Sequence, residues 1–539
     1  MADDRITEDI VRAAVAGATA AMRTGNLEDA HRIAAAGIDA GMEDPFLYKV
    51  EGLWLQNRGE NAEALRQFHH ARELDPDDPM TLVGIAGTLS GMGAHDAALK
   101  IARTALDIAP DHVSANYVHA RTLEALREYR AAKAAYERTL RLRPGHVQAI
   151  EGLATVAVRL QDYPLARAQA ERALALAPGQ PTATTALAMV EMAEGQPKKA
   201  ETLLRAMLAK PMAANARAVA AGVLGDALDA QNRFDEAFAA YAEENSLLKS
   251  SRSADGPSVA AALDALAANL AATSGRWSKL PPAGAGPAHT HVFLLGFMRS
   301  GTTLVERALA AHGEVAVLEE VDLLAEPFGR YLASADGLEA LLAAGDDALD
   351  AAREAYWTGV RENGVAPDGK VVVDKLPLNT QKLPLIARLF PGAKILFAVR
   401  DPRDVVFSCF RRHFSVNTLT AEFHTIEDTA RLYDATMRIG AWSRAELPLA
   451  FHEVRHEALV EDFEAGMRQL CAFLGLAWSD ALTTLAPPST ARGEAALSAP
   501  QLSRGLNDEG VGRWRAYAGH LSPILPVVAP WVEAFGYPA

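Results

Sequence analysis

Small apolar positions recur at a fixed interval through the first half of the chain. Six alanines follow one another at a spacing of 34 residues: Ala30, Ala64, Ala98, Ala132, Ala166 and Ala200. Twelve residues before each of them stands another small residue: Ala18, Gly52, Ala86, Ala120, Ala154 and Ala188. Twelve residues after four of them stands a proline: Pro76, Pro110, Pro144 and Pro178. Because proline ends a helix and small residues let two helices cross closely, the pattern predicts a repeated helix–turn–helix unit.

A seventh unit follows slightly out of phase, with Gly225 and Ala237 again 12 residues apart. The period, the small residues and the terminal prolines resemble the tetratricopeptide repeat over residues 8–248, although the Trp and Tyr of that repeat are largely missing. The resemblance implies an all-α superhelical array of about seven repeats, whose concave surface can hold a peptide or another protein. The alternative is a scaffold that only covers one side of the rest of the chain or mediates self-association. A homo-oligomer is therefore also possible.

The composition changes after Leu248. Residues 249–289 are predicted to form a capping helix and a linker, since leucines recur at helical spacing from Leu263 to Leu270 and residues 281–287 are rich in Pro and Gly. A second domain is predicted over residues 290–539.

That domain begins with an apolar run at 291–295, of β character, which leads into a glycine loop and a helical stretch. Gly296 and Gly301 are separated by four residues and followed by Thr302 and Thr303. Glycines let backbone N–H groups face an anion, and a helix N-terminus adds partial positive charge. The spacing is that of a Walker A motif, but Thr302 replaces its lysine, which argues against a triphosphatase or a kinase. A structural glycine turn is the alternative interpretation.

The loop residues Arg299, Ser300, Gly301, Thr302 and Thr303 resemble the 5′-phosphosulfate-binding loop of sulfotransferases. The resemblance is strongest to the tyrosylprotein sulfotransferases and their bacterial repeat-bearing relatives. It implies that these residues hold the 5′-phosphate and sulfate end of 3′-phosphoadenosine-5′-phosphosulfate (PAPS), which is released as adenosine 3′,5′-bisphosphate (PAP).

A second strand–turn–helix unit follows at residues 394–410. Arg400 ends an apolar strand, Asp401-Pro402 opens a helix and Ser408 lies about two turns in, so Arg400 and Ser408 are predicted to share one anion. The resemblance implies that this anion is the 3′-phosphate of the donor. Two such units predict a P-loop-like α/β domain built on a parallel sheet.

Three residues are candidates for the chemistry. Sulfuryl transfer needs positive charge on the sulfate, and Arg299 of the glycine loop is the candidate for that role. Glu320 lies 21 residues after Arg299, and the resemblance implies that it is the general base, with Glu319 as the fallback. Lys375 ends a run of three valines, and the resemblance implies that it stabilises the leaving group. Two solvated acids and a surface lysine are the alternative interpretation. Asp322 stands where the tyrosine enzymes carry an arginine, so their preference for acidic peptides is not carried across.

The late part of the chain adds weaker candidates. Arg504 and Arg513 lie in segments that resemble the closing segment of the family, and either is expected to add charge near the 3′-phosphate. Residues 505–510 between them are expected to form a mobile loop, and His456 is interpreted as structural. The 15 histidines form no metal-binding motif, so no metal is expected.

Bulk composition limits the remaining choices. A net charge of −15 argues against a nucleic-acid partner. Cys409 and Cys471, the two cysteines, are expected to be buried thiols in a reducing compartment. Without a signal peptide or a membrane-length apolar run, the prediction is a cytoplasmic PAPS-dependent sulfotransferase. Its acceptor is a hydroxyl, with a protein or peptide bound by the repeats favoured over a glycan, lipid or small molecule. A repeat scaffold with a nucleotide-binding but non-catalytic domain is the alternative, and a kinase is the second.

Overall fold

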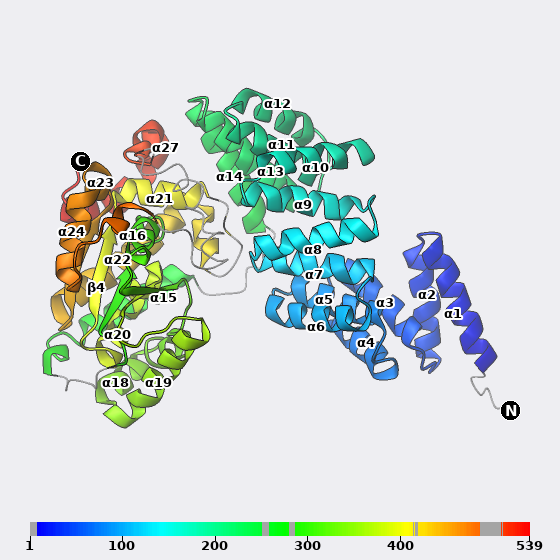
Figure 1. The fold of residues 1–539 in the computed structure, drawn as a ribbon, viewed down its shortest axis with the longest axis horizontal. Coiled ribbons are helices and arrows are strands. Elements are labelled where there is room, and N and C mark those ends of the chain that lie inside the picture. The colour runs from blue at the N-terminus through cyan, green and yellow to red at the C-terminus, as the bar shows by residue number, and fades with distance from the viewer. Residues whose placement is uncertain are drawn as a thin grey trace. The chain divides into compact units, whose positions relative to one another are not determined.

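The computed structural model of the chain describes residues 8–250, 258–279, 286–412, 414, 419–485, 508 and 510–539. The chain divides into two compact units, residues 1–194 and 195–539. The order of elements confirms the predicted fold class, a helical repeat array followed by a parallel-sheet domain (Figure 1).

The first unit is a series of helices of nearly equal length. Their bounds are α1 (Glu8–Arg23), α2 (Leu27–Asp39), α3 (Pro45–Asn57), α4 (Asn61–Leu74), α5 (Pro79–Gly91), α6 (His95–Ile108), α7 (Val113–Ala125), α8 (Tyr129–Leu142), α9 (Val147–Arg159), α10 (Tyr163–Leu176) and α11 (Pro181–Ala193). Aspartates such as Asp44 and Asp78 cap helices that begin with proline, because their carboxylates accept the free N–H groups of the first turn.

The small residues of the repeat are required by close helix contacts. A Cβ added to Gly52 would lie 2.9 Å from the ring of Phe68, and one added to Gly152 would overlap the ring of Tyr136. The turns inside the units also share one geometry, because left-handed backbone recurs every 34 residues. The positions are Gly25 (φ 76°), Gly59 (78°), Gly93 (82°), Arg127 (62°), Gln161 (59°) and Gly195 (71°). Arg127 and Gln161 adopt this conformation without glycine, so the tertiary fold imposes it there.

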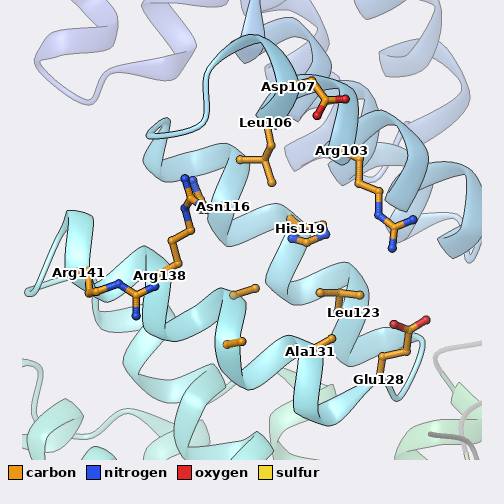
Figure 2. A pocket seen from close by; sticks show the side chains of 12 residues that line it. Arg103, Leu106, Asp107, Asn116, His119, Leu123, Glu128, Ala131, Arg138 and Arg141 are labelled. Carbon is orange, nitrogen blue, oxygen red and sulfur yellow. The ribbon is translucent and has the colours of Figure 1, made fainter. Parts of the chain in front are cut away.

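A pocket of about 580 Å³ lies between α6, α7 and α8. Figure 2 shows His119 of α7 near its middle, with Arg103 on one side and Arg138 and Arg141 on the other. Nε2 of His119 is buried and has no hydrogen-bond partner among the described residues. Burial, and then the charge of Arg103, lower the pKa of His119, so the ring is neutral there.

The second unit begins with α12 (Pro197–Leu208), α13 (Ala214–Asp229), α14 (Phe234–Ser250) and α15 (Val259–Ala271). The helices α13 and α14 correspond to the seventh unit of the sequence period, so this hairpin lies in the same compact unit as the sheet.

The sheet has five parallel strands in the order β2-β3-β1-β4-β5. Their bounds are β1 (Thr290–Leu295), β2 (Val315–Glu319), β3 (Val371–Lys375), β4 (Lys394–Val399) and β5 (Ala450–Arg455). The remaining helices are α16 (Thr302–Ala310), α17 (Ala325–Tyr331), α18 (Ala335–Ala343), α19 (Asp346–Glu362), α20 (Leu383–Leu389), α21 (Pro402–Phe410), α22 (Ile426–Glu446), α23 (His456–Glu461), α24 (Phe463–Leu474), α27 (Ala518–Leu521) and α28 (Leu525–Ala534). Short 3₁₀ turns include η2 (Pro377–Lys382) and η5 (Arg513–Tyr517).

Both faces of the sheet are buried, as a parallel sheet requires. On one face Val292 and Leu294 of β1 pack with Leu304 of α16 and Met467 of α24. On the other, Phe293 packs with the rings of α19 and its neighbours. Because helices cover both faces, the carboxyl ends of the strands are the expected place for a ligand in a sheet of this kind.

Candidate functional site

The charged residues predicted for the site lie at or shortly after the carboxyl ends of four strands. Arg299 follows β1, Glu320 follows β2, Lys375 ends β3 and Arg400 follows β4. Because all the strands are parallel, their carboxyl ends meet at one edge of the sheet.

The loop after β1 has the backbone of an anion cradle. Gly296, Arg299 and Gly301 have φ of 149°, 69° and 94°, which is left-handed or near it. A Cβ added to Gly301 would lie 2.6 Å from Nδ1 of His456, so only glycine fits. Gly301 is also the N-cap of α16 and supplies no side-chain acceptor to its first N–H groups. These uncapped donors, with the buried Thr302 beside them, fit the phosphosulfate end of a donor such as PAPS.

The two predicted donor-binding elements are in contact. Nε of Arg299 donates to Oγ of Ser408 at 3.1 Å. Nη1 of Arg400 donates to the carbonyl of Arg299 at 3.1 Å, and Nη2 donates to the carbonyl of Gly510. Nε of Arg400 is buried and has no hydrogen-bond partner among the described residues. The structure therefore brings the residues of both loops together.

Positive charge is concentrated around Arg299. Burial and then the charges of Arg412, Arg400 and Arg411 together lower the pKa of Arg299 to about 9. A group of cations that repel one another is stabilised by an anion between them, so the charges fit the 3′-phosphate proposed from sequence.

The other charged centre is built on Lys375, whose side chain is 0% exposed. Its Nζ lies 2.7 Å from Glu320, 3.0 Å from Glu306 and 3.6 Å from Glu319. Burial alone would lower the pKa of Lys375, but these carboxylates outweigh it and raise the pKa. Lys375 is thus a buried ammonium at all ordinary pH values, not a surface lysine.

The backbone fixes Glu320 next to Lys375. Its N–H donates to the carbonyl of Lys375 at 2.9 Å, and its φ of 49° is left-handed. Such strain in a non-glycine residue persists only where surrounding contacts hold it, and it is concentrated at functional sites. The side chain of Glu320 is 46% exposed, so its carboxylate can reach a ligand while it contacts Lys375.

Comparison with known proteins finds matches for both halves of the chain. Residues 291–480 match the family model described as the sulfotransferase family, and residues 117–181 match a tetratricopeptide repeat model. The second half of the chain contains a sulfotransferase-family domain. The predicted combination of tetratricopeptide repeats with such a domain is confirmed.

Curated relatives align with about half of the chain. An uncharacterized protein of Aquifex aeolicus is 27% identical over 258 residues, which are 45% of this chain and 32% of that protein. Protein-tyrosine sulfotransferase 2 of Gallus gallus is 29% identical over 266 residues (46% of this chain, 69% of that one). Protein-tyrosine sulfotransferase 1 of Danio rerio is 26% identical over 260 residues (46% and 72%). The chain therefore spans about a third of the Aquifex protein and about 70% of the two vertebrate enzymes.

Solved structures show a weak likeness to part of the chain. A tetratricopeptide repeat protein of Parabacteroides merdae has a TM-score of 0.35 at 18% identity, covering 44% of this chain and 93% of its own. The Cut9-Hcn1 complex has a TM-score of 0.37 at 17% identity, covering 45% of this chain and 46% of its own.

Within the described ranges, no helix is both long and apolar enough to cross a bilayer.

The late segment of the sulfotransferase domain is placed only in part. Arg504 lies outside the described residues, as does most of the predicted loop 505–510. Nη2 of Arg513 lies 2.7 Å from the carboxylate of Asp229, at the end of α13. The structure therefore pairs Arg513 with the last repeat hairpin rather than placing it beside Arg299 or Arg400.

Both cysteines are free and buried.

Sequence reasoning missed one residue that contacts Lys375, Glu306. Glu306 was not singled out, although it is buried on α16 against Lys375. Burial raises the pKa of Glu306 to about 7, with Lys375 opposing and Glu319 supporting the shift. Glu306 lies four residues after Thr302, about one turn along α16, and this spacing is a signal that could have found it.

His456, which the sequence analysis interpreted as structural, lies next to the phosphate loop. Its ring packs against Gly301. Burial, and then the charges of Arg400 and Arg299, together lower the pKa of His456 to about 3. The ring is therefore neutral, and its contact with the loop is steric.

Asp322 has a partner of its own. Its carboxylate accepts from Nζ of Lys382, whose side chain is 5% exposed. The position held by arginine in the tyrosine enzymes thus carries a charge pair here, so the local charge differs from that of the resembled site.

Proposed function

We propose that the chain transfers the sulfuryl group of PAPS to a hydroxyl acceptor. The observation that carries the proposal is the contact of Lys375 with Glu320, at the sheet edge where the loop of Arg299 forms an anion cradle. PAPS supplies a sulfuryl group that is activated by its bond to a phosphate.

Each residue has a distinct part in this proposal. Ser300, Thr302 and Thr303, with the free N–H groups of α16, bind the phosphosulfate end. Arg400 and Ser408 bind the 3′-phosphate. Arg299, which already contacts Ser408 at 3.1 Å, adds its charge near the sulfuryl group.

The proton and charge balance follow from Glu320 and Lys375. A carboxylate oxygen of Glu320 accepts the proton of the attacking hydroxyl. Lys375 has three N–H groups, one of which donates to Glu320 while Glu306 lies at an ion-pair distance of 3.0 Å, and another N–H donates to the oxygen that leaves with the phosphate. The sulfur–oxygen bond to that phosphate breaks as the bond to the acceptor oxygen forms, and PAP keeps the electron pair.

The acceptor is proposed to be a protein or peptide hydroxyl presented by the repeat array. The pocket of about 580 Å³ between α6, α7 and α8 supports a binding role for the repeats, since Arg103 and Arg141 line it. Both guanidinium groups lack an ion-pair partner among the described residues.

The two buried thiols are consistent with a reducing compartment, and we place the reaction in the cytoplasm.

A thermal-shift comparison separates the proposal from its competitors. PAP should stabilise the full chain, by about 2.7 kcal/mol at a hundredfold excess over its dissociation constant, and ATP with magnesium should not. Stabilisation by ATP alone would favour a kinase, and stabilisation by neither would favour a scaffold.

Activity is tested by transfer of radiolabelled sulfate from PAPS into protein of a cell lysate. The full chain should label protein and the Glu320→Gln variant should not, while the exposed Glu326→Gln variant serves as a control that labels normally. Equal labelling by the Glu320 variant would refute its role as the base. Label confined to glycan, lipid or small molecules would refute a protein acceptor.

A further inference from the structure

The last helical hairpin of the repeats, α13 and α14, packs on the end of α21. Nδ2 of Asn245 donates to the buried carbonyl of Phe410 at 2.8 Å, and the ring of Phe238 stacks on Phe410 at 5.1 Å. The final carbonyls of a helix have no partner inside it, so Asn245 satisfies one of them. The hairpin therefore fixes where α21 ends.

One carboxylate on this hairpin gathers three donors. Asp229, the last residue of α13, lies 3.3 Å from Nη1 of Arg411 and 2.7 Å from Nη2 of Arg513. It also accepts the hydroxyl of Tyr517. Its side chain is only 13% exposed, so these contacts replace water almost completely. Asp229 thus joins the residue after α21 to the 3₁₀ turn η5.

Both of these segments contact the proposed donor site. The helix α21 carries Ser408, which accepts from Arg299 at 3.1 Å. The stretch that leads into η5 includes Gly510, whose carbonyl accepts from Arg400. Asp404 of α21 in turn accepts the backbone N–H groups of Gly512 and Trp514 at 2.6 and 2.8 Å. A shift of Asp229 would therefore be transmitted to both Arg299 and Arg400.

Charge and position give opposite expectations for the loss of this carboxylate. Removing the negative charge of Asp229 would make the surroundings of Arg411, Arg412 and Arg299 more positive. By Coulomb attraction alone, an anion would then bind more tightly. If Asp229 acts by holding the two segments in place, the same change weakens binding.

We infer that Asp229 is a positioning residue for the donor, so that the last repeat hairpin forms part of the donor site. Arg411, Arg513 and Tyr517 are the contacts through which it acts. The inference rests on the proposed function, since the anion it positions is the 3′-phosphate of PAPS.

The test is the dissociation constant of PAP, measured by calorimetry on full-length variants. Asp229→Asn should weaken PAP binding about tenfold or more, which corresponds to a loss of about 1.4 kcal/mol in binding free energy. Asp229→Glu should restore part of the affinity because it restores the charge. Asp235→Asn is the matched control. Asp235 lies on the same hairpin as Asp229 and pairs with His520, but its side chain is 94% exposed and it contacts neither Arg411 nor Arg513. The control should bind PAP as the wild type does.

Turnover distinguishes positioning from general damage. With saturating PAPS, Asp229→Asn should lose much less kcat than Glu320→Gln does, because Asp229 contacts Arg411, Arg513 and Tyr517 and not Glu320 or Lys375. If that variant does not fold, Tyr517→Phe removes only one hydroxyl and should weaken PAP binding about threefold.

The outcomes separate the two levels of the argument. Unchanged or tighter PAP binding by Asp229→Asn, or unchanged binding by Tyr517→Phe where only that variant folds, would overturn the positioning role. A wild-type chain that does not bind PAP would overturn the proposed function, and the inference with it.

Discussion

Nζ of Lys375 lies 2.7 Å from Oε1 of Glu320, although 55 residues separate them in the chain. The contact follows from the sheet, because β2 and β3 are neighbours in a register that pairs Glu319 with Lys375. The proposed base and the proposed stabiliser of the leaving group are thus preorganised on two adjacent strand ends.

Loss of the Lys375 ammonium should affect the chemical step more than donor binding. Lys375→Met removes the N–H group directed at the leaving oxygen, and we expect the single-turnover rate to fall about 100-fold or more. The dissociation constant of PAP should change by less than about threefold, because that product has no sulfuryl group. Lys370→Met, which removes a half-buried lysine just before the same strand, is the control. A rate loss explained entirely by weaker PAP binding would contradict the assignment.

Arg400 should matter for donor affinity instead. A hydrogen bond to a charged group is worth about 1.5–3 kcal/mol, so Arg400→Gln should weaken PAP binding about 10- to 100-fold. Ser408→Ala should have a smaller effect, since it removes one neutral hydroxyl. Arg431→Gln is a control on α22, where that side chain is 65% exposed. Calorimetry that finds the same dissociation constant for Arg400→Gln and wild type would exclude the 3′-phosphate role.

The repeat array could be predicted because its contacts are periodic. A small residue every 34 positions has one physical explanation, the close crossing of helices, and Gly52 against Phe68 shows that contact. The turns could be anticipated where they carry glycine. At Arg127 and Gln161 the left-handed backbone has no local signal, because neighbouring helices impose it.

The candidate site could be predicted where residues follow strands. Parallel strands bring their carboxyl ends together regardless of sequence separation, so Arg299, Lys375 and Arg400 had to meet at one edge. Glu306 and Asp229 lie on helices, where the face that meets a partner depends on how the helix is rotated in the fold. Asp229 is 182 residues from Arg411, and nothing in the local sequence connects them.

The buried carboxylate of Glu306 should make stability depend on pH. Burial raises its pKa from 4.5 to about 7 in the folded chain. The folded state then binds a proton more tightly than the unfolded state, so this group's contribution to the free energy of unfolding falls as pH rises from about 4.5 to about 7. Glu306→Gln cannot ionise and should lack that fall, so its stability relative to wild type should improve toward pH 7.

Thermal unfolding at pH 5 and pH 7.5 measures this difference. The matched control is Glu314→Gln, an exposed residue just beyond α16. A constant gap in melting temperature between Glu306→Gln and wild type at both pH values would show that Glu306 does not titrate in this range.

Two glycines test whether the last hairpin differs from the other repeats. An added Cβ at Gly152 of α9 would overlap the ring of Tyr136, and one at Gly225 of α13 would lie 2.5 Å from the ring of Tyr241. Overpacking of this kind costs about 1–3 kcal/mol, so both glycine-to-alanine variants should unfold at lower temperature. The hydroxyl of Tyr241 donates to Asp226 at 2.9 Å, three residues before Asp229 on the same helix. Gly225→Ala should therefore also weaken PAP binding, and Gly152→Ala should not. Equal PAP affinities in calorimetry at a temperature where both variants are folded would show that the strain at Gly225 does not reach the donor site.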